Sequence, residues 1–150
     1  MKDAPSSITY SSVVSRDSVC LAFVLAALND LDVMMCDIGN AYLNAPCREK
    51  IWFKGGCETG EDKGKVLVMT RAIYGLKSSG ASWRSMLAGT LQELGFQDTR
   101  ADPDVWQQPA TKDNGTKYYK LLLVHVDDIL MVFEDPKTTL KLIGKTYDIK

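Results

Sequence analysis

Three aspartates stand where the sequence can assemble an oxygen-rich metal site. Asp127 and Asp128 are adjacent and lie between two apolar runs, and Asp37 directly follows the apolar segment Val33–Cys36. Neighbouring carboxylates raise each other's pKa unless a cation neutralises them, and carboxylate oxygens are the ligands that Mg²⁺ prefers. We therefore expect Asp37, Asp127 and Asp128 to share two Mg²⁺ ions, with Mn²⁺ as an alternative metal.

Such a site is suited to phosphoryl chemistry. Two Mg²⁺ ions about 4 Å apart, bridged by carboxylates, stabilise both the attacking and the leaving oxygen of an in-line displacement at phosphorus. On these residues alone a second interpretation stays open, in which Asp127 and Asp128 form only a polar turn between two strands.

The flanking segments predict strands that bring these carboxylates together. Lys117–Val126 and Ile129–Phe133 are apolar runs on either side of the paired aspartates, so we expect a β-hairpin with a doubly anionic tip. Successive strand side chains point to opposite faces, and both aspartates can serve one site only at a bend, which the hairpin tip supplies. Val33–Cys36 is expected to be a short buried strand that ends at Asp37.

The remaining segments predict helices and short strands that support the hairpin. Val19–Leu28 is apolar on nearly every face and is expected to be a buried helix capped by Asp17 or Ser18. Ser82 is expected to cap a second helix that Gly95 ends. Further elements are expected over residues 51–53, 65–69 and 105–106, with a last helix starting at residues 135–136. This irregular order predicts an α+β fold, an antiparallel sheet with helices on one face.

Length and composition indicate one ordinary globular domain. With 150 residues, 45% hydrophobic and 25% charged, the chain falls outside the ranges of disordered and fibrous proteins. Its 18 Lys and Arg residues against 19 Asp and Glu residues give a net charge of −1, which does not by itself indicate a nucleic-acid partner. No linker or repeat is evident, so we expect residues 1–150 to form one domain with no internal boundary.

Cysteine spacing and hydropathy argue against two further classes of protein. The four cysteines include no Cys-x-x-Cys pair and lie far from His125, the single histidine, so no structural zinc site is expected. We interpret the thiols as reduced, in an intracellular protein. The longest apolar stretch, residues 19–28, is shorter than the roughly 20 residues that span a bilayer, and no membrane contact is expected.

Four sequence blocks then occur in order along the chain. They are Tyr10–Val14, Cys36–Asn44, Ile73–Lys77 with Trp83 and Leu94–Phe96, and Ala101–Pro103 with Val124–Leu130. In this order and at these separations the blocks resemble the reverse transcriptase of copia-type retrotransposons. The resemblance covers the chain from about residue 10 to residue 150.

The resemblance implies a fold, a reaction and a set of site residues. The fold would be the palm of a right-hand polymerase with part of the fingers, and the reaction the extension of a primer by deoxynucleoside triphosphates on an RNA or DNA template. Asp37 and Asp127 would be the main Mg²⁺ ligands, supported by Asp128. Tyr42 falls where such polymerases place a ring under the incoming sugar, and it would exclude a 2′-hydroxyl; packing against the palm is the alternative role for this ring.

The implied partners follow from the same resemblance. They are a template–primer duplex, the deoxynucleoside triphosphate and the remainder of a Gag-Pol-type polyprotein. The implied location is intracellular, in a cytoplasmic virus-like particle or in the nucleus.

Two positions depart from the family pattern. His125 stands where the family usually has Tyr before x-Asp-Asp, and we interpret this histidine in an apolar strand as a packed, hydrogen-bonded side chain. Ser78 stands where many members place Gln toward the incoming nucleotide, and we expect the backbone of a flexible loop at Ser78 to face a phosphate instead. The chain also ends at Lys150, ahead of the expected thumb, so an alternative function is an inactive or truncated remnant that keeps the palm as a binding module.

A phosphate-binding P-loop is a further alternative. Gly75–Ser82 nearly fits the pattern Gly-x₄-Gly-Lys-Ser between a strand-like segment and a helix. Ala81 replaces the lysine that reaches the phosphates in that motif, and Lys77 inside the loop cannot take its place. The reverse transcriptase interpretation is therefore preferred.

Overall fold

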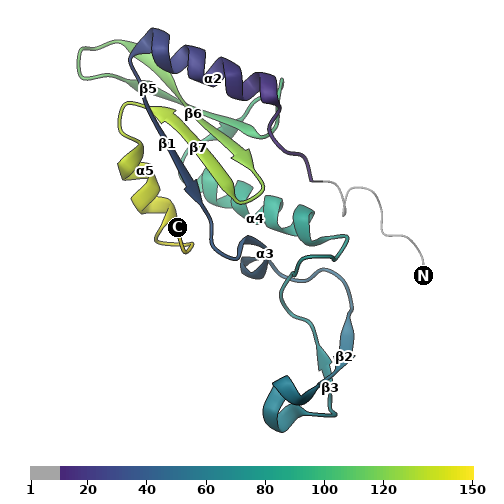
Figure 1. Cartoon of the computed structure of the whole chain (residues 1–150). Helices are drawn as coiled ribbons and strands as arrows, with labels where there is room; N and C mark the ends of the chain where they lie inside the picture. Colours follow the sequence, from purple (N-terminus) through teal and green to yellow (C-terminus); the bar gives the residue numbers. More distant parts are fainter. Residues whose placement is uncertain (1–10) are drawn as a thin grey trace. The chain divides into compact units, whose positions relative to one another are not determined.

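The computed structural model describes residues 11–150, so Tyr10 of the first sequence block lies outside the described residues (Figure 1). The helices are α2 (Arg16–Asn29), α3 (Ala41–Asn44), α4 (Ser79–Glu93) and α5 (Pro136–Ile143), with a 3₁₀ segment, η1 (Cys57–Asp62). The strands are β1 (Asp32–Asp37), β2 (Trp52–Lys54), β3 (Val66–Val68), β4 (Gln97–Asp98), β5 (Val105–Thr111), β6 (Lys117–His125) and β7 (Asp128–Phe133).

The described residues form two compact units, and the prediction of one domain over residues 1–150 stays a prediction. One unit contains residues 42–86, and the other contains residues 12–41 and 87–150. The chain passes from one unit to the other at two crossings. The first lies between Ala41 and Tyr42 inside α3, and the second lies between Met86 and Leu87 inside α4. Because both crossings lie within helices, no Gly- or Pro-rich linker marks them in the sequence.

The larger unit holds a five-stranded antiparallel sheet in the order β1-β7-β6-β5-β4. Its centre is the hairpin of β6 and β7, which the sequence predicted, and β1 pairs with β7 along its whole length from Asp32 opposite Phe133 to Asp37 opposite Asp128. The turn at Asp113–Gly115 joins β5 to β6. The predicted strand that ends at Asp37 is thus a neighbour of the strand that begins at Asp128.

Helices cover both faces of this sheet, so the expectation of helices on one face is wrong. On one face, Leu123 and Val132 pack with Ala22 of α2. On the other, the ring of Phe133 lies 6.4 Å from the ring of Phe96, which follows α4, and α5 packs against β1 and β7. The reason is visible in the sequence: the apolar runs of β6 and β7 are continuous, as in strands that are buried on both faces.

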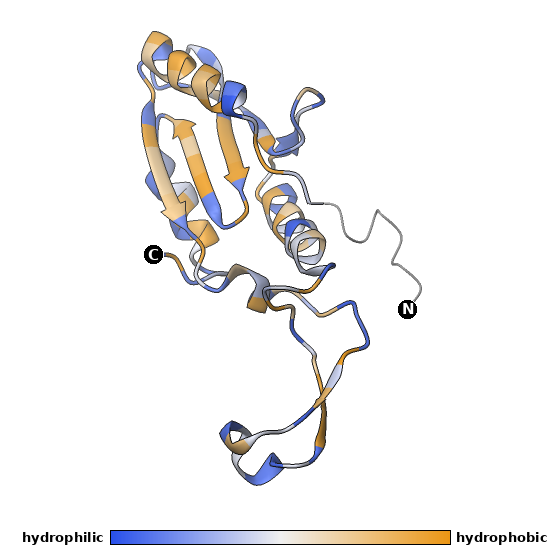
Figure 2. Cartoon of the chain, turned by 45° about the vertical axis from the view of Figure 1, so that its right-hand side comes forward, coloured by the Kyte–Doolittle hydropathy of each residue, from blue (hydrophilic) through white to orange (hydrophobic). Residues whose placement is uncertain are grey.

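Helix α2 is largely exposed, although its composition predicted a buried helix. Only its small side chains, Ala22 and Ala26, are buried. Its large apolar side chains remain 43–77% exposed; they are Leu21, Phe23, Val24, Leu25 and Leu28, and Figure 2 shows the helix as predominantly hydrophobic. The two alanines let the helix approach the sheet closely on one narrow stripe, which leaves the larger side chains facing outward.

Among the described residues, no helix has the length and apolarity to cross a membrane.

The helix ends differ in part from the predictions. Helix α2 is capped by Ser15, whose Oγ accepts from the N–H of Ser18 at 3.1 Å. Helix α4 starts at Ser79, three residues before the predicted cap, and the hydroxyl of Ser82 donates to the carbonyl of Pro46 at 2.7 Å. Gly95, at φ +88°, follows α4 as predicted, because a left-handed residue after a helix favours glycine.

Candidate active site

Three polar side chains form a row across the neighbouring strands β1, β7 and β6. Asp37 lies directly opposite Asp128, and Asp128 lies directly opposite His125. Residues directly opposite each other in an antiparallel pair point to the same face of the sheet. The two carboxylates and the imidazole therefore share one face of the sheet. Asp128, Leu130 and Val132 are every second residue of β7 and point to the same face, and Leu130 and Val132 belong to the core cluster with α2. The shared face is therefore the one on which α2 packs.

The hairpin that carries Asp127 and Asp128 closes with a strained two-residue turn. His125 pairs with Asp128, which leaves Val126 and Asp127 as the loop. Val126 has φ +59°, whereas Asp127 has a negative φ, the pattern of a type II′ turn. A β-branched residue rarely adopts this conformation, and its strain costs about 1–3 kcal/mol. The N–H of Ile38 donates to the carbonyl of Asp127 at 2.9 Å, which ties the strained turn to the residue after Asp37.

Asp37 has an unsatisfied carboxylate oxygen. Its Oδ1 atom is buried and accepts no hydrogen bond from any residue that the structure describes. The nearest cation is the Nζ of Lys150, 3.8 Å from Oδ1, and the N–H of Lys150 donates to the Asp37 carbonyl at 3.0 Å. The Asp37 side chain as a whole is 40% exposed, and Lys150 lies beyond hydrogen-bond distance of Oδ1, so a bound cation would be a closer partner for this oxygen.

The raised pKa of Cys36 reflects the negative charge of this region. The side chain is 4% exposed, and burial, then the charges of Asp37 and Asp128, raise the pKa of its thiol to about 11. The thiol therefore stays protonated near neutral pH and is not a nucleophile. The negative potential that acts on Cys36 is the same potential that favours a divalent cation beside the two carboxylates.

The ligand atoms available at this site are of the type that Mg²⁺ prefers, but they are fewer than the three carboxylates that the sequence predicted. Asp37 and Asp128 supply hard carboxylate oxygens from neighbouring strands, which suits Mg²⁺. Across residues 11–150, however, no three His, Cys, Asp or Glu side chains are grouped closely enough to hold a metal ion. The structure thus brings two of the three predicted carboxylates into one row and leaves Asp127 on the adjoining turn.

A cavity of about 510 Å³ opens beside this row. Its lining is mostly apolar and comes from α2, the segment before it, and strands β1, β6 and β7; the residues are Val14, Arg16, Val19, Phe23, Met35, Leu123, His125, Asp128 and Leu130. His125 is exposed, so the expectation that it is packed inside the strand is wrong. It is the last residue of β6 and lies at the end of the apolar run rather than within it.

Sequence reasoning did not single out Arg16, which lines the same cavity as Asp128. Arg16 opens α2 directly after the capping residue, and the preceding segment is anchored to the sheet by the bond from the Val14 N–H to the Val124 carbonyl at 3.1 Å. No local pattern links residues 14–16 to the hairpin more than 100 positions away. A guanidinium in this position is suited to an anionic ligand.

The predicted nucleotide contact at Ser78 lies in the smaller unit and is already engaged. Ser78 is 1% exposed, and both its N–H and its hydroxyl donate to Oε1 of Glu49, at 2.8 and 2.7 Å. These two hydrogen bonds, hydroxyl first, lower the pKa of Glu49, with a further contribution from the charge of Lys77. The donors of Ser78 therefore hold a carboxylate of the chain itself and do not face a phosphate.

The neighbouring segment also decides the P-loop alternative. Gly80 and Ala81 lie inside helix α4, which begins at Ser79. The helix start is compatible with the motif, but the Ser78 N–H inside this segment is bonded to Glu49 and is not available to surround a phosphate. This contact, together with Ala81 in place of the lysine, argues against the P-loop interpretation.

Tyr42, the second predicted nucleotide contact, lies in α3 of the smaller unit. Its ring is partly exposed and lies 4.5 Å from the ring of Tyr74, measured between centroids, at an interplanar angle of 52°. Tyr74 belongs to the third sequence block, but nothing in the pattern predicted that the two rings meet. The pair fixes the orientation of Tyr42 within its own unit.

A mixed fold with an antiparallel sheet and carboxylates at its central hairpin is consistent with a reverse transcriptase-like domain. A family model described as "Reverse transcriptase (RNA-dependent DNA polymerase)" matches residues 5–147, and the chain belongs to this family. No solved structure shows a significant match.

The curated relatives are retrotransposon polyproteins. The chain is 30% identical over 146 residues to the Retrovirus-related Pol polyprotein from transposon TNT 1-94 of Nicotiana tabacum. This alignment covers 94% of the chain and 11% of the relative. It is 25% identical over 144 residues to the Truncated transposon Ty1-A Gag-Pol polyprotein of Saccharomyces cerevisiae, 93% of the chain and 11% of the relative. The Transposon Ty1-DR5 Gag-Pol polyprotein matches at the same identity over 8% of its length. The resemblance to copia-type reverse transcriptases is confirmed, and the chain spans about a tenth of the length of these relatives.

Proposed function

We propose that this chain supplies the palm and part of the fingers of the RNA-directed DNA polymerase of a Gag-Pol-type polyprotein. It would transfer nucleotides from deoxynucleoside triphosphates to the 3′-hydroxyl of a primer on an RNA or DNA template, with release of pyrophosphate. Family membership supports the reaction class. The observation that carries the assignment of the site is the pairing of Asp37 with Asp128 on neighbouring strands, next to the turn that holds Asp127.

Asp37, Asp127 and Asp128 would together supply the oxygen ligands of the metal ions, Asp37 and Asp128 from neighbouring strands and Asp127 from the adjoining turn. When bound, two Mg²⁺ ions would stabilise charge on the attacking and leaving oxygens of the phosphoryl group. The hydrogen bond from the Ile38 N–H to the Asp127 carbonyl would restrict the movement of the turn relative to Asp37, and it helps to keep Val126 in its strained conformation. The chain thereby orients the carboxylates before any substrate arrives.

Two residues of the smaller unit have supporting roles in this proposal. Tyr42 would lie under the incoming sugar, and its ring would exclude a 2′-hydroxyl, which selects deoxynucleotides. Ser78 would act through Glu49: its two hydrogen bonds to that carboxylate fix the start of α4. Ser78 is thus proposed as a positioning residue in place of a direct nucleotide contact.

Primer extension on an RNA template tests the proposal. The assay contains Mg²⁺ and all four deoxynucleoside triphosphates, and it compares this chain with a longer chain that carries flanking polyprotein sequence. Extension that chelation abolishes and that added Mg²⁺ or Mn²⁺ restores is the expected result for at least one of the two. A folded longer chain that binds template–primer and extends no primer would instead support the inactive remnant that keeps the palm as a binding module.

A further inference from the structure

Helix α2 carries an apolar stripe on the side that faces away from the sheet. Ala22 and Ala26 are buried, and Val24, two residues from each, lies on the opposite side of the helix, because an α-helix has 3.6 residues per turn. Leu21 and Leu28 lie three residues before and four residues after Val24, so they share its side. We call these three side chains the outer stripe; Leu21 is 63%, Val24 53% and Leu28 77% exposed.

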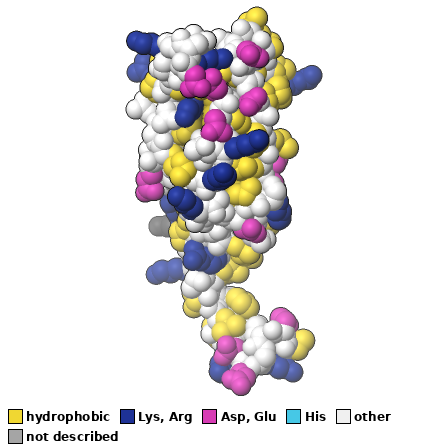
Figure 3. All heavy atoms as spheres, turned by 90° about the vertical axis from the view of Figure 1, so that its left-hand side faces the viewer, with side chains coloured by type: hydrophobic (Ala, Val, Ile, Leu, Met, Phe, Trp, Pro, Cys, Tyr) yellow, Lys and Arg dark blue, Asp and Glu magenta, His cyan; other side chains and the backbone are white. Residues whose placement is uncertain are grey.

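No charged residue interrupts this part of the surface of α2. Residues 18–29 contain no Lys, Arg, Asp or Glu, and Phe23 and Leu25 flank the outer stripe with further exposed apolar surface. On the face of the molecule in Figure 3, by contrast, acidic and basic side chains lie among the hydrophobic ones. A group of neighbouring exposed apolar side chains is typical of an interaction surface, whereas a single one needs no explanation.

Charges of both signs stand at the N-terminal end of α2. Arg16 and Asp17 are exposed in its first turn. Asp102 also reaches this end, where its carboxylate accepts hydrogen bonds from the Ser15 N–H at 2.9 Å and the Ser18 hydroxyl at 2.6 Å. With Asp102 held in this way, Arg16 and Asp17 are the exposed charges that a molecule on the outer stripe would meet at this end.

The C-terminal end of α2 is predominantly acidic. Asp30 caps the helix and Asp32 opens β1, and both are exposed. The half-buried Lys112 donates from its Nζ to the carbonyl of Asp30 at 3.1 Å, which places its charge at the same end. The two ends of the helix therefore differ, with an exposed arginine at one and two exposed aspartates beside a lysine at the other.

A second copy of the chain fits the outer stripe when its α2 runs in the opposite direction. Leu21 and Leu28 are nearly equidistant from Val24, so a two-fold axis near Val24 would place Leu21 of one copy beside Leu28 of the other. The same apolar surface is then buried on both copies, as a two-fold symmetric contact requires.

The charges at the helix ends favour this direction of pairing. In the antiparallel pair, Arg16 comes near Asp30 and Asp32 of the second copy, and Asp17 comes near Lys112. In a parallel pair each of these residues would lie near its own counterpart, which brings like charges together. An anionic lipid surface would fit less well, because membrane-surface helices are rich in Lys and Arg and residues 16–30 contain only Arg16.

We propose that two copies of this chain associate through the outer stripes of α2 in an antiparallel, two-fold symmetric pair, with Arg16 of each copy near Asp30 and Asp32 of the other. Two helices of 14 residues bury less than a standard interface of about 1,600 Å², so the dimer should be weak, with a Kd of about 1–100 μM. This association does not depend on the proposed polymerase function.

The antiparallel pair of β2 and β3, here called the ribbon, offers a matched control surface. Trp52, Val66 and Val68 are 70%, 67% and 68% exposed. Lys54 lies opposite Val66 and shares its face, so a charge interrupts this apolar surface, unlike that of α2. A change at Val68 therefore tests an exposed apolar position outside the proposed interface.

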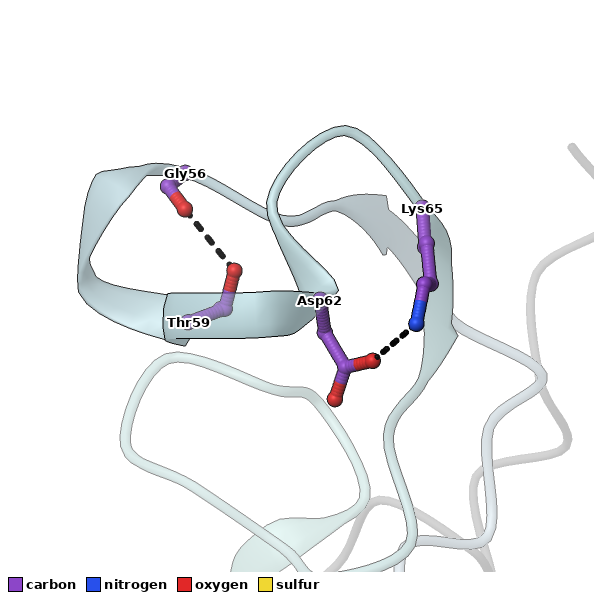
Figure 4. Close-up of polar contacts among 4 residues, drawn as sticks. All are labelled: Gly56, Thr59, Asp62 and Lys65. Atoms are coloured by element: carbon purple, nitrogen blue, oxygen red, sulfur yellow. Dashed lines mark hydrogen bonds and ion pairs between the residues drawn. The ribbon is translucent and has the colours of Figure 1, made fainter.

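Polar contacts at the tip hold the ribbon without covering this face. Figure 4 shows the hydroxyl of Thr59 donating to the carbonyl of Gly56 at 2.8 Å, and the Nζ of Lys65 paired with Oδ1 of Asp62 at 2.8 Å. A charge introduced at Val68 leaves these contacts in place.

Sedimentation equilibrium of the whole chain at about 1–500 μM tests the proposal. The weight-average mass of the parent should rise with concentration from the 16.6 kDa of one chain toward twice that value. Leu28→Glu should raise the Kd at least about tenfold, because it places a carboxylate inside the apolar contact. Val68→Glu should leave the Kd within about twofold of the parent. Circular dichroism of each variant checks that the fold is kept.

Charge reversal tests the direction of the pair. Arg16→Glu should raise the Kd about three- to tenfold, and adding Asp32→Arg to it should restore the Kd to within about twofold of the parent, because the exchanged charges again attract. A double variant that dimerises more weakly than Arg16→Glu alone would overturn the antiparallel arrangement.

A parent that stays at 16.6 kDa up to about 500 μM would overturn the proposal. Dissociation by Val68→Glu and not by Leu28→Glu would overturn it in favour of the ribbon. Binding of a monomeric parent to phosphatidylcholine–phosphatidylserine vesicles through Leu28 would overturn it in favour of a lipid surface. Asp127→Asn should dimerise like the parent, so a chain that dimerises and extends no primer refutes the polymerase function alone.

Discussion

The five-stranded sheet and the two-stranded ribbon of β2 and β3 are both antiparallel, yet the sheet buries its central side chains and the ribbon leaves its side chains exposed. Leu122 and Met131, at the centre of the sheet, are fully buried, whereas Trp52 and Val68 of the ribbon are about 70% exposed. A hairpin that is paired on both sides and covered on both faces holds one geometry, which suits carboxylates that must stay in register. A ribbon that buries little depends on its own tip contacts and leaves one apolar face exposed.

The largest expected difference between the two regions is in stability. Leu122→Ala should lower the free energy of unfolding by about 2–5 kcal/mol, because it leaves a cavity in a well-packed core. Val68→Ala should change it by less than about 0.5 kcal/mol, because the side chain is exposed in the folded state. Urea unfolding followed by circular dichroism measures both values. Equal losses would show that the ribbon is as tightly packed as the sheet, against the burial described above.

A second test concerns the strain at the hairpin turn. Val126→Gly should raise the free energy of unfolding by about 1 kcal/mol, because glycine adopts φ +59° without the strain of a β-branched side chain. Val33→Gly in β1 is the control, and it should lower stability by about 1 kcal/mol, since an ordinary strand residue gains nothing from glycine. If both variants are destabilised alike, the turn is not strained.

The smallest expected effect is the pH dependence that Glu49 brings to the smaller unit. Hydrogen bonds from Ser78 lower the pKa of Glu49 below its ordinary value of 4.5. Its stabilising contribution should therefore be fully present above pH 4.5 and be lost as the pH falls through the lowered pKa. Glu49→Gln should remove this dependence, and Glu61→Gln, at an exposed position in η1 of the same unit, should leave it intact. Unfolding curves recorded at several pH values would measure it, and an unchanged acid dependence in Glu49→Gln would contradict the prediction.

The sequence predicted the parts of the site that local patterns encode. The hairpin around Asp127 and Asp128 follows from two apolar runs separated by charges, and the strand end at Asp37 follows from the same rule. The continuous apolar runs also contained the signal for cover on both faces of the sheet, but the irregular order of the elements favoured cover on one face.

Other features depended on contacts between distant residues. The bonds from Ser78 to Glu49 join positions 29 residues apart, so neither residue predicts the other. Helix α2 is largely exposed because it packs on the sheet only through Ala22 and Ala26. Its uniformly apolar composition gave no sign of which residues would make this contact. His125 was expected inside a strand, and the two-residue turn instead placed it at the strand's end.

The most direct test of the account is the rate of single-nucleotide incorporation by a chain active in primer extension, measured for the parent, Asp127→Asn and Asp98→Asn. Asp98 lies on β4, at the far edge of the same sheet, and is exposed, so it controls for the loss of one negative charge. The account predicts a rate at least about a hundredfold lower for Asp127→Asn, because metal stabilisation of the phosphoryl charge is worth several kcal/mol. Asp98→Asn should stay within about twofold of the parent, and incorporation by Asp127→Asn at the parental rate would contradict the central claim.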